Sequence, residues 1–225
     1  PYYRPSPSLA ANDSTMVSVW VEHAELDNSG TLVIGTLDRT SHQFSRTGTI
    51  ARNRNGIHDP SVTLVGNAGD AIIAWTQNDR NAGEVANDAP VASLLRSENV
   101  HVAFYDASIG GVTSSFKVAD QSGNRMDGNV SVAVAPDGSN AMVVWASMEP
   151  SANSTDITGV RLFRVDGRWE MGDPRIIATT PGLDRDLSLG TLAAGTYLIS
   201  WISENVQTGA TDARYVTSTE TAWTT

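Results

Sequence analysis

The chain has 225 residues, 40% of them hydrophobic and 18% charged, which is an ordinary composition for a folded globular protein. Its formal net charge of -10 argues against a nucleic-acid partner, because binding to a phosphate backbone needs a basic surface. The absence of cysteine excludes disulfides, thiolate metal sites and a cysteine nucleophile. No apolar run of about 18 residues occurs, so we expect no membrane span.

One sequence pattern recurs four times along the chain. Its clearest copy covers residues 59–75: an acidic residue, a serine two positions later, a turn rich in Asn, Asp and Gly, and an apolar run that ends in tryptophan. The repeated positions are Ser8, Ser61, Ser131 and Ser188, and Trp20, Trp75, Trp145 and Trp201. The tryptophans lie 55, 70 and 56 residues apart, and a repeat of this length predicts an array of supersecondary units.

Each copy continues beyond its tryptophan in the same way. A third strand is predicted at residues 31–38, 100–106, 159–166 and 213–219, and a fourth begins near Phe44, Phe116, Trp169 and Trp223. The strands are rich in β-branched residues, and Gly, Asp and Asn lie between them. The unit is therefore four short strands joined by turns.

Repeated four-stranded units are typical of a β-propeller. We predict an all-β protein, a β-propeller of four four-stranded blades at about residues 6–52, 58–120, 127–179 and 185–225. The ring either closes with help from residues 1–5, or belongs to a larger ring that a second copy or another chain completes. A two-sheet sandwich is the competing fold, but it predicts no such repeat.

The repeated tryptophan has a structural explanation. It lies at the same place on each second strand, so it can fill the wedge between neighbouring blades. We prefer this packing role to one in stacking against sugars.

The repeat resembles those of sialidase-like (BNR-type) propellers, through the small or acidic residue before the serine-containing first strand and the tryptophan that ends the second. The superfamily's Asp-box, S-x-D-x-G-x-x-W, is absent, and residues 165–169 match only its end. The resemblance implies the architecture and leaves the activity open.

In a propeller, the loops between strands four and one and between strands two and three emerge on one face. Binding residues are usually located on such loops. The insertion at residues 78–99 belongs to this face, as a functional lid or as a mobile surface segment. The candidate ligand-binding residues are Arg52, Arg54, His58, Asp59, Arg125, Asp127, Arg185, Asp186, Glu22, His23, Gln77 and Glu204.

Catalysis is the weaker interpretation of these loops. A sialidase holds the carboxylate of its substrate with three arginines and also needs a Tyr/Glu nucleophile pair and an acidic aspartate. Asp59 and Glu204 could serve as carboxylates, but Tyr105 and Tyr215 are predicted on third strands, away from the loop face. We therefore assign no catalytic residue and leave the enzyme question open, leaning towards no.

Asp59, Asn129 and Asp186 share the position before the first strand. They are expected to cap the turn there, and a ring of carboxylates that holds a cation is the alternative. Fragments of calcium-loop spacing are incomplete, and the four histidines show no zinc spacing. We predict no metal site and no cofactor, with Ca²⁺ as the weakly supported alternative.

The function predicted from these patterns is a non-catalytic binding or structural module. It would belong to a larger exported or surface protein, bacterial and extracellular or periplasmic, with a protein or a glycan docked on the loop face. The alternative is a sialidase-like glycoside hydrolase, or a part of one.

Overall fold

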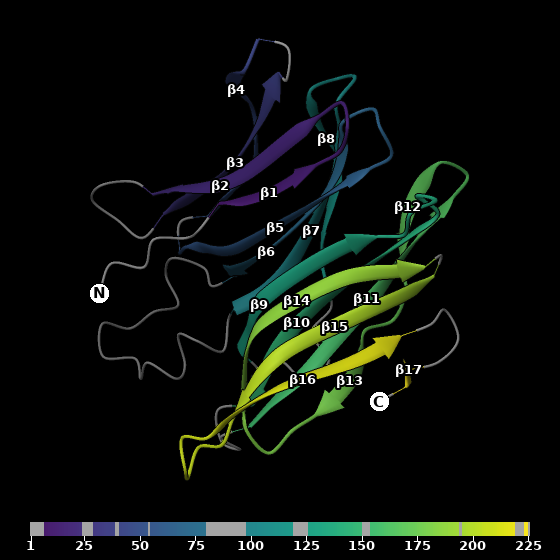
Figure 1. Cartoon of the computed structure of the whole chain (residues 1–225). Helices are drawn as coiled ribbons and strands as arrows, with labels where there is room; N and C mark the ends of the chain where they lie inside the picture. The colour runs from purple at the N-terminus through teal and green to yellow at the C-terminus, as the bar shows by residue number, and fades with distance from the viewer. Residues whose placement is uncertain are drawn as a thin grey trace.

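The computed structural model describes residues 7–23, 29–38, 41–53, 55–79, 98–118, 126–149, 154–193, 195–218 and 223–224. Within these ranges the chain forms four antiparallel sheets in sequence order and no helix (Figure 1). The first two sheets consist of β1 (Ser8–Ala11), β2 (Met16–His23), β3 (Gly30–Asp38) and β4 (Gln43–Asn53), then β5 (Ile57–Val65), β6 (Asp70–Asn78), β7 (Glu98–Asp106) and β8 (Gly111–Lys117).

The third and fourth sheets repeat the same up-and-down order. They consist of β9 (Met126–Val134), β10 (Asn140–Glu149), β11 (Ser154–Val165), β12 (Arg168–Met171) and β13 (Arg175–Thr179), then β14 (Leu183–Ala193), β15 (Thr196–Glu204), β16 (Thr211–Ser218) and β17 (Trp223–Thr224). Both β12 and β13 pair with β11, at opposite ends of it, so they act as one interrupted fourth strand.

Apolar side chains fill the space between successive sheets. Alternate residues of β2 and β3 pack against the near face of the second sheet, and similar clusters join the second sheet to the third and the third to the fourth. Trp75, Trp145 and Trp201 are almost fully buried, each in the cluster between its own sheet and the preceding one. The predicted wedge role of these three tryptophans is confirmed.

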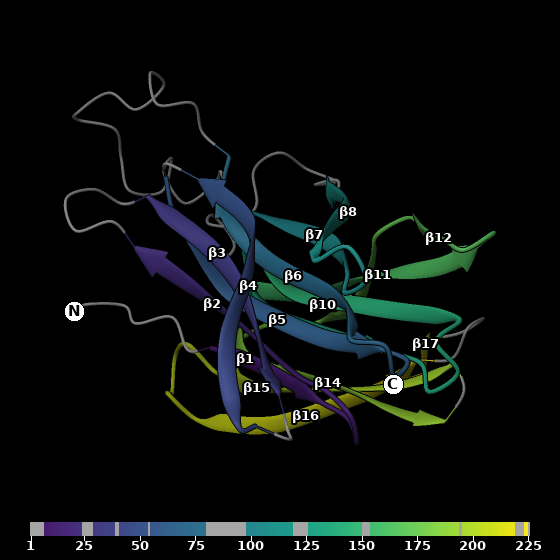
Figure 2. The ribbon, with the colours of Figure 1, turned by 90° about the horizontal axis from the view of Figure 1, so that it is seen from above.

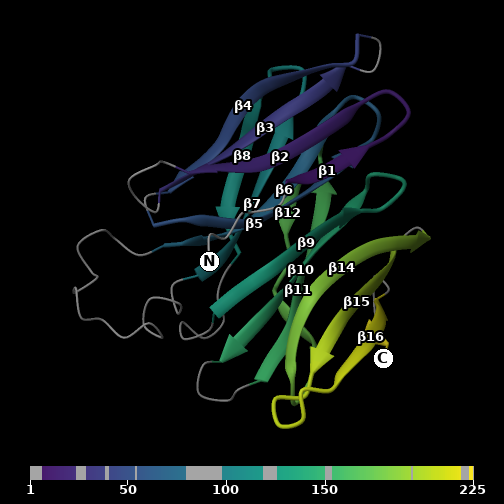
Figure 3. The ribbon, with the colours of Figure 1, turned by 60° about the vertical axis from the view of Figure 1, so that its left-hand side comes forward.

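The four sheets are arranged as an open fan. Contacts between first strands run from β1 to β5, from β5 to β9 and from β9 to β14, and no contact of similar extent returns from β14 to β1 among the described residues. Two views show the first and the last sheet at opposite ends of the fan (Figures 1 and 3), and Figure 2 shows the molecule from above.

The outer faces of the fan keep apolar side chains in contact with solvent. On the first sheet, Leu9 is 59% exposed and Trp20 is only partly buried. On the last sheet, Leu192 and Tyr215 are exposed. Closure through residues 1–5 lies outside the described residues.

The first strand of three sheets is interrupted at the same point. Asp59, Asn129 and Asp186 have φ values of 48°, 52° and 56°, and the pairing register shifts at each of them. Asp and Asn tolerate this left-handed backbone better than other residues with a side chain. The repeated Asp/Asn therefore marks a β-bulge inside the strand rather than a turn before it.

The predicted all-β propeller with four sheets is confirmed. β3, β7 and β16 lie close to the predicted third strands, and β4, β12 and β17 begin at or next to the predicted aromatic residues. Two predictions are wrong in their bounds: β11 begins at Ser154 rather than at residue 159, and β8 begins at Gly111, so that Phe116 lies near its end rather than its start. In the insertion, residues 80–97 lie outside the described residues. No helix among the described residues is long and apolar enough to cross a membrane.

Candidate active site

The loop face gathers ionisable groups from two neighbouring sheets. His23 ends β2, His58 and Asp59 lie near the start of β5, and Glu98 begins β7. Each acts electrostatically on at least one of the others: the charge of Asp59 acts on both His58 and Glu98, and His23 acts on His58. The structure thus brings three of the predicted residues together and adds Glu98, which the sequence did not single out.

Glu98 is the group most strongly affected by this environment. Burial raises its pKa to about 7, the hydrogen bond from Asn78 opposes the shift, and the negative charges of Asp59 and Asp79 add to it. The Asn78 Nδ2 donates to Oε1 over 3.1 Å, while the buried Oε2 has no hydrogen-bond partner among the described residues. The carboxyl group is therefore still partly protonated at neutral pH.

The repeat shows that Glu98 departs from the pattern. The equivalent position, three residues beyond the tryptophan in the strand pairing, is occupied by Gly30, Thr155 and Thr211 in the other sheets. In the third sheet the Thr155 hydroxyl accepts a hydrogen bond from the N–H of Asp184, at the start of the next first strand. By the same geometry, Glu98 is placed next to the start of β9.

Asp59 links two sheets by a direct hydrogen bond. Its Oδ2 accepts from the N–H of Asn129 over 3.0 Å, so the carboxylate satisfies a backbone donor of the next sheet. Burial lowers the pKa of His58, and the charge of Asp59 opposes this shift. A neutral imidazole therefore lies beside a carboxylate at the entrance to the second sheet.

A second group of side chains fixes the end of β6. Trp75 Nε1 donates to Gln77, Gln77 Nε2 donates to Asp79 over 2.9 Å, and the Asp79 carboxylate also binds His101 and Lys117. Burial opposes ionisation of Asp79, but the hydrogen bonds from His101 and Gln77 outweigh it and hold its pKa at about 2. Both polar atoms of the Gln77 side chain, a predicted binding residue, thus take part in this chain of hydrogen bonds.

On the fourth sheet, the predicted residues contact one another. Arg185 Nη1 lies 2.7 Å from the carboxylate of Asp186, and its Nε lies 3.5 Å from that of Glu204. All three side chains are well exposed to solvent. This group contains one more negative charge than positive charge, so it is a poor site for an anion.

Among the remaining predicted residues, Glu22 and Asp127 contact other side chains of their own sheets. Glu22 pairs with Arg46 at 3.1 Å and accepts from Trp20 Nε1. Asp127 is buried and accepts from the Ser147 hydroxyl over 2.7 Å. Arg52 is an exposed residue of β4. Arg54 and Arg125 lie outside the described residues.

The alternative of a cation held by the repeated acidic position finds no ligand set. Within the described ranges, no group of three or more His, Asp or Glu side chains could hold a metal ion. Asp59 instead binds the backbone of Asn129, and Asp186 binds Arg185.

Glu98 and Asp79 were missed because each looks like an ordinary polar residue at the edge of an insertion. A comparison of the four copies at matched strand positions would have found Glu98, since it replaces Gly or Thr. Asp79 gave no such signal, because its low pKa depends on partners from β6, β7 and β8.

Comparisons with known proteins identify the fold through structure alone. No protein-family model matches the chain. No curated protein matches it either. A GH43 endo-arabinanase from Bacillus licheniformis superimposes with a TM-score of 0.53 at 10% identity, over 97% of this chain and 75% of that one.

Two further solved structures are similar in the same way. An exo-1,5-α-L-arabinanase from a bovine ruminal metagenomic library gives a TM-score of 0.55 at 11% identity, over 99% of this chain and 78% of that one. The α-L-arabinofuranosidase Arb93A from Fusarium graminearum gives 0.56 at 9% identity, over 95% and 64%. The superpositions show that the chain shares the propeller fold of these proteins, and at identities this low they show the fold alone.

These neighbours correct one prediction. They are named as enzymes that act on glycosides, so the interpretation of the chain as a non-catalytic binding or structural module is wrong as the first choice. The alternative, a glycoside hydrolase or a part of one, is better supported. The propeller part of the resemblance to sialidase-like repeats is confirmed, whereas the neighbours bear the names of arabinanases and arabinofuranosidases.

Proposed function

We propose that the chain is a glycoside hydrolase, or the larger part of one, and that Glu98 is its general acid. The observation that carries the proposal is the half-buried carboxyl group of Glu98, whose pKa of about 7 keeps it partly protonated at neutral pH, within the electrostatic reach of Asp59 on the loop face of the propeller. Glycoside hydrolysis needs two carboxyl groups with different protonation states. The glycosidases that share the fold support the same assignment.

The two carboxyl groups have distinct roles in this proposal. Glu98 protonates the oxygen of the leaving group, and its pKa near 7 suits proton transfer at neutral pH. Asp59 supplies the negative charge that faces the sugar, and its bond to the N–H of Asn129 fixes the carboxylate. Burial disfavours the ionised form of Glu98, which keeps the group available as an acid.

A neutral glycan is the substrate class that this face favours. Asp59, Asp79, Asp186 and Glu204 add negative charge to the loop face, where Arg185 pairs with two of them and Lys117 with Asp79. An anionic sugar would be repelled there. We therefore propose arabinose-containing oligosaccharides, in line with the enzyme names of the structural neighbours, ahead of sialosides. Such a substrate fits an exported protein.

Turnover by a matched pair of variants tests the proposal. Wild-type protein is incubated with arabinan, β-1,3-galactan and a sialoside, and the released sugar is measured. Glu98→Gln should lower kcat by about 10² to 10⁴, the usual contribution of a general acid. Glu170→Gln, an exposed control on β12, should retain full activity. Absence of turnover on all three substrates, or full activity of Glu98→Gln, would overturn the proposal.

A further inference from the structure

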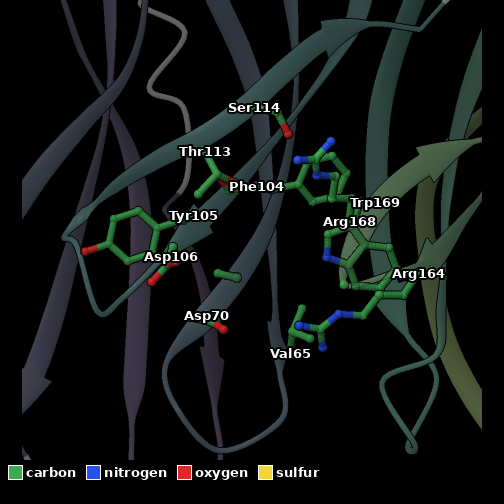
Figure 4. A pocket seen from close by; sticks show the side chains of 12 residues that line it. Val65, Asp70, Phe104, Tyr105, Asp106, Thr113, Ser114, Arg164, Arg168 and Trp169 are labelled. Atoms are coloured by element: carbon green, nitrogen blue, oxygen red, sulfur yellow. The ribbon is translucent and has the colours of Figure 1, made fainter.

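A cleft lies between the second and third sheets, at the end of the molecule opposite to Glu98. Glu98 begins β7 and Asp106 ends it, so the two ends of this strand are about 26 Å apart. The cleft has a volume of about 580 Å³, which suits a small organic ligand. Figure 4 shows its side chains, which come from the ends of β5 to β8 and from the β11–β12 hairpin.

One wall of the cleft is cationic. Arg164 and Arg168 line it, both are exposed, and the guanidinium groups have no ion pair or hydrogen bond among the described residues. The hairpin that carries them is tight, because Asp166 and Gly167 at its turn have φ values of 51° and 79°. The backbone N–H of Arg164 also donates to Ser139 over 3.0 Å. The two cations are therefore carried by one fixed hairpin, on either side of Trp169 (Figure 4).

An aromatic ring lies between the two arginines (Figure 4). Trp169 is the partner of Arg164 in the β11–β12 ladder, and it lies parallel to Phe104 of the second sheet, with centroids 5.6 Å apart and planes inclined by 4°. This stacking fixes the indole across the gap between the sheets. A fixed and partly exposed indole offers an apolar surface to a sugar ring.

The opposite wall offers hydrogen-bond acceptors. Asp70 Oδ1 accepts from the N–H of Ala107 over 3.0 Å, and Asp106 Oδ1 accepts from the N–H and the hydroxyl of Ser108. Neither carboxylate forms an ion pair with Arg164 or Arg168 among the described residues, so the opposite charges stay separated across the cleft. Ser114 adds an exposed hydroxyl.

We propose that this cleft binds a carboxylate-bearing sugar, a uronate unit of a glycan. Planar guanidinium forks match a carboxylate, and the wall of aspartates accepts hydrogen bonds from sugar hydroxyls. A neutral sugar would leave both guanidinium groups without a partner. A compact dianion such as inorganic phosphate would contact only the arginines, and the aspartates on the opposite wall would repel it. The cleft would thus hold a glycan at a second point, distant from Glu98.

Direct binding measurements test the proposal without reference to turnover. Digalacturonate is titrated into the full chain by calorimetry, with the neutral galactobiose and inorganic phosphate as comparison ligands. Arg164→Gln and Arg168→Gln should each weaken digalacturonate binding by about tenfold or more, the usual loss of a charge-assisted hydrogen bond. Arg175→Gln is the matched control, an exposed arginine of β13 outside the cleft.

Two further variants show whether digalacturonate binds in the cleft or at the site of Glu98. Ser114→Trp fills the cleft without a change in charge and should abolish binding, whereas Glu98→Gln should leave it unchanged even though it removes hydrolysis. Equal affinity for galactobiose, equal affinity for phosphate, or no effect of the two arginine substitutions would overturn the proposal. Failure to bind digalacturonate at about 10 mM, far weaker than common small-ligand affinities, would overturn it as well.

Discussion

Ser61 in the second sheet accepts a hydrogen bond of 3.1 Å from the backbone N–H of Val132 in the third sheet. One sheet earlier, Ser8 accepts from the N–H of Val62 over the same distance. In these two copies the repeated serine therefore joins the first strands of neighbouring sheets. The bond gives the serine of the first two copies a structural role.

Removal of this hydroxyl should destabilise the protein. Ser61→Ala leaves the N–H of Val132, a residue only 5% exposed, without its partner, and we expect a loss of about 1–2 kcal/mol in the free energy of unfolding. Ser188→Ala is the control, because Ser188 is exposed and should change stability by less than about 0.5 kcal/mol. Urea denaturation measures both, and equal losses would contradict the inter-sheet role.

The pKa of Glu98 predicts how stability depends on pH. Its folded value of about 7 lies above its ordinary value of 4.5, so the protonated carboxyl group favours the folded state. This contribution is fully present below pH 4.5 and is lost as the pH rises to about 7, by about 3 kcal/mol in total.

Glu98→Gln should abolish that component. The variant should lose less stability than the wild type between pH 4.5 and 8, and the difference between the two curves isolates Glu98 from all other titrating groups. Glu170→Gln, exposed on β12, should follow the wild-type curve. Chemical denaturation across this pH range provides the measurement, and parallel curves for wild type and Glu98→Gln would show that Glu98 titrates normally.

The charge of Asp59 should be visible in the titration of Glu98. Asp59→Asn keeps an oxygen that can accept from Asn129, and it keeps a residue type that occupies the same left-handed position in the third sheet. Only the charge is lost, so the pKa of Glu98 should fall and the basic limb of the pH–rate profile should move to lower pH.

Carbon-13 NMR of the Glu98 carboxyl group gives this pKa without any substrate. Asp186→Asn serves as the control at the matched position of the fourth sheet, because Asp186 is not among the charges that act on Glu98. An unchanged Glu98 pKa in Asp59→Asn, or an equal fall in both variants, would contradict the proximity of Asp59 and Glu98.

The sequence predicts the fold better than the site, for a physical reason. Strand positions, turns and the tryptophan wedge depend on residue types that recur in each copy, so four weak signals support one another. Glu98 depends on burial and on charges supplied by other strands. Arg185 is an example of a predicted binding residue that has another role. The sequence predicts that its guanidinium group binds a ligand, but the group pairs with the carboxylates of Asp186 and Glu204.

Trp20 and Trp75 occupy the same repeat position but different surroundings. Trp75 is 2% exposed between two sheets, whereas Trp20 lies on the outer face of the first sheet, against Phe44 at 5.5 Å. Trp75→Ala should therefore cost about 3–5 kcal/mol in unfolding free energy, the usual loss for a buried aromatic. Trp20→Ala should cost less than half as much, because solvent already reaches its ring.

The comparison of Trp20→Ala with Trp75→Ala also tests how the ring is completed in solution. It is made by urea denaturation at two protein concentrations, together with light scattering to determine the mass. Equal losses for Trp20→Ala and Trp75→Ala would show that something covers the outer face of the first sheet. If a second copy were responsible, the wild-type protein would also have twice the monomer mass and would become more stable at the higher concentration. A monomer with unequal losses is the expected outcome, since the described part of the first sheet has no neighbour on that side.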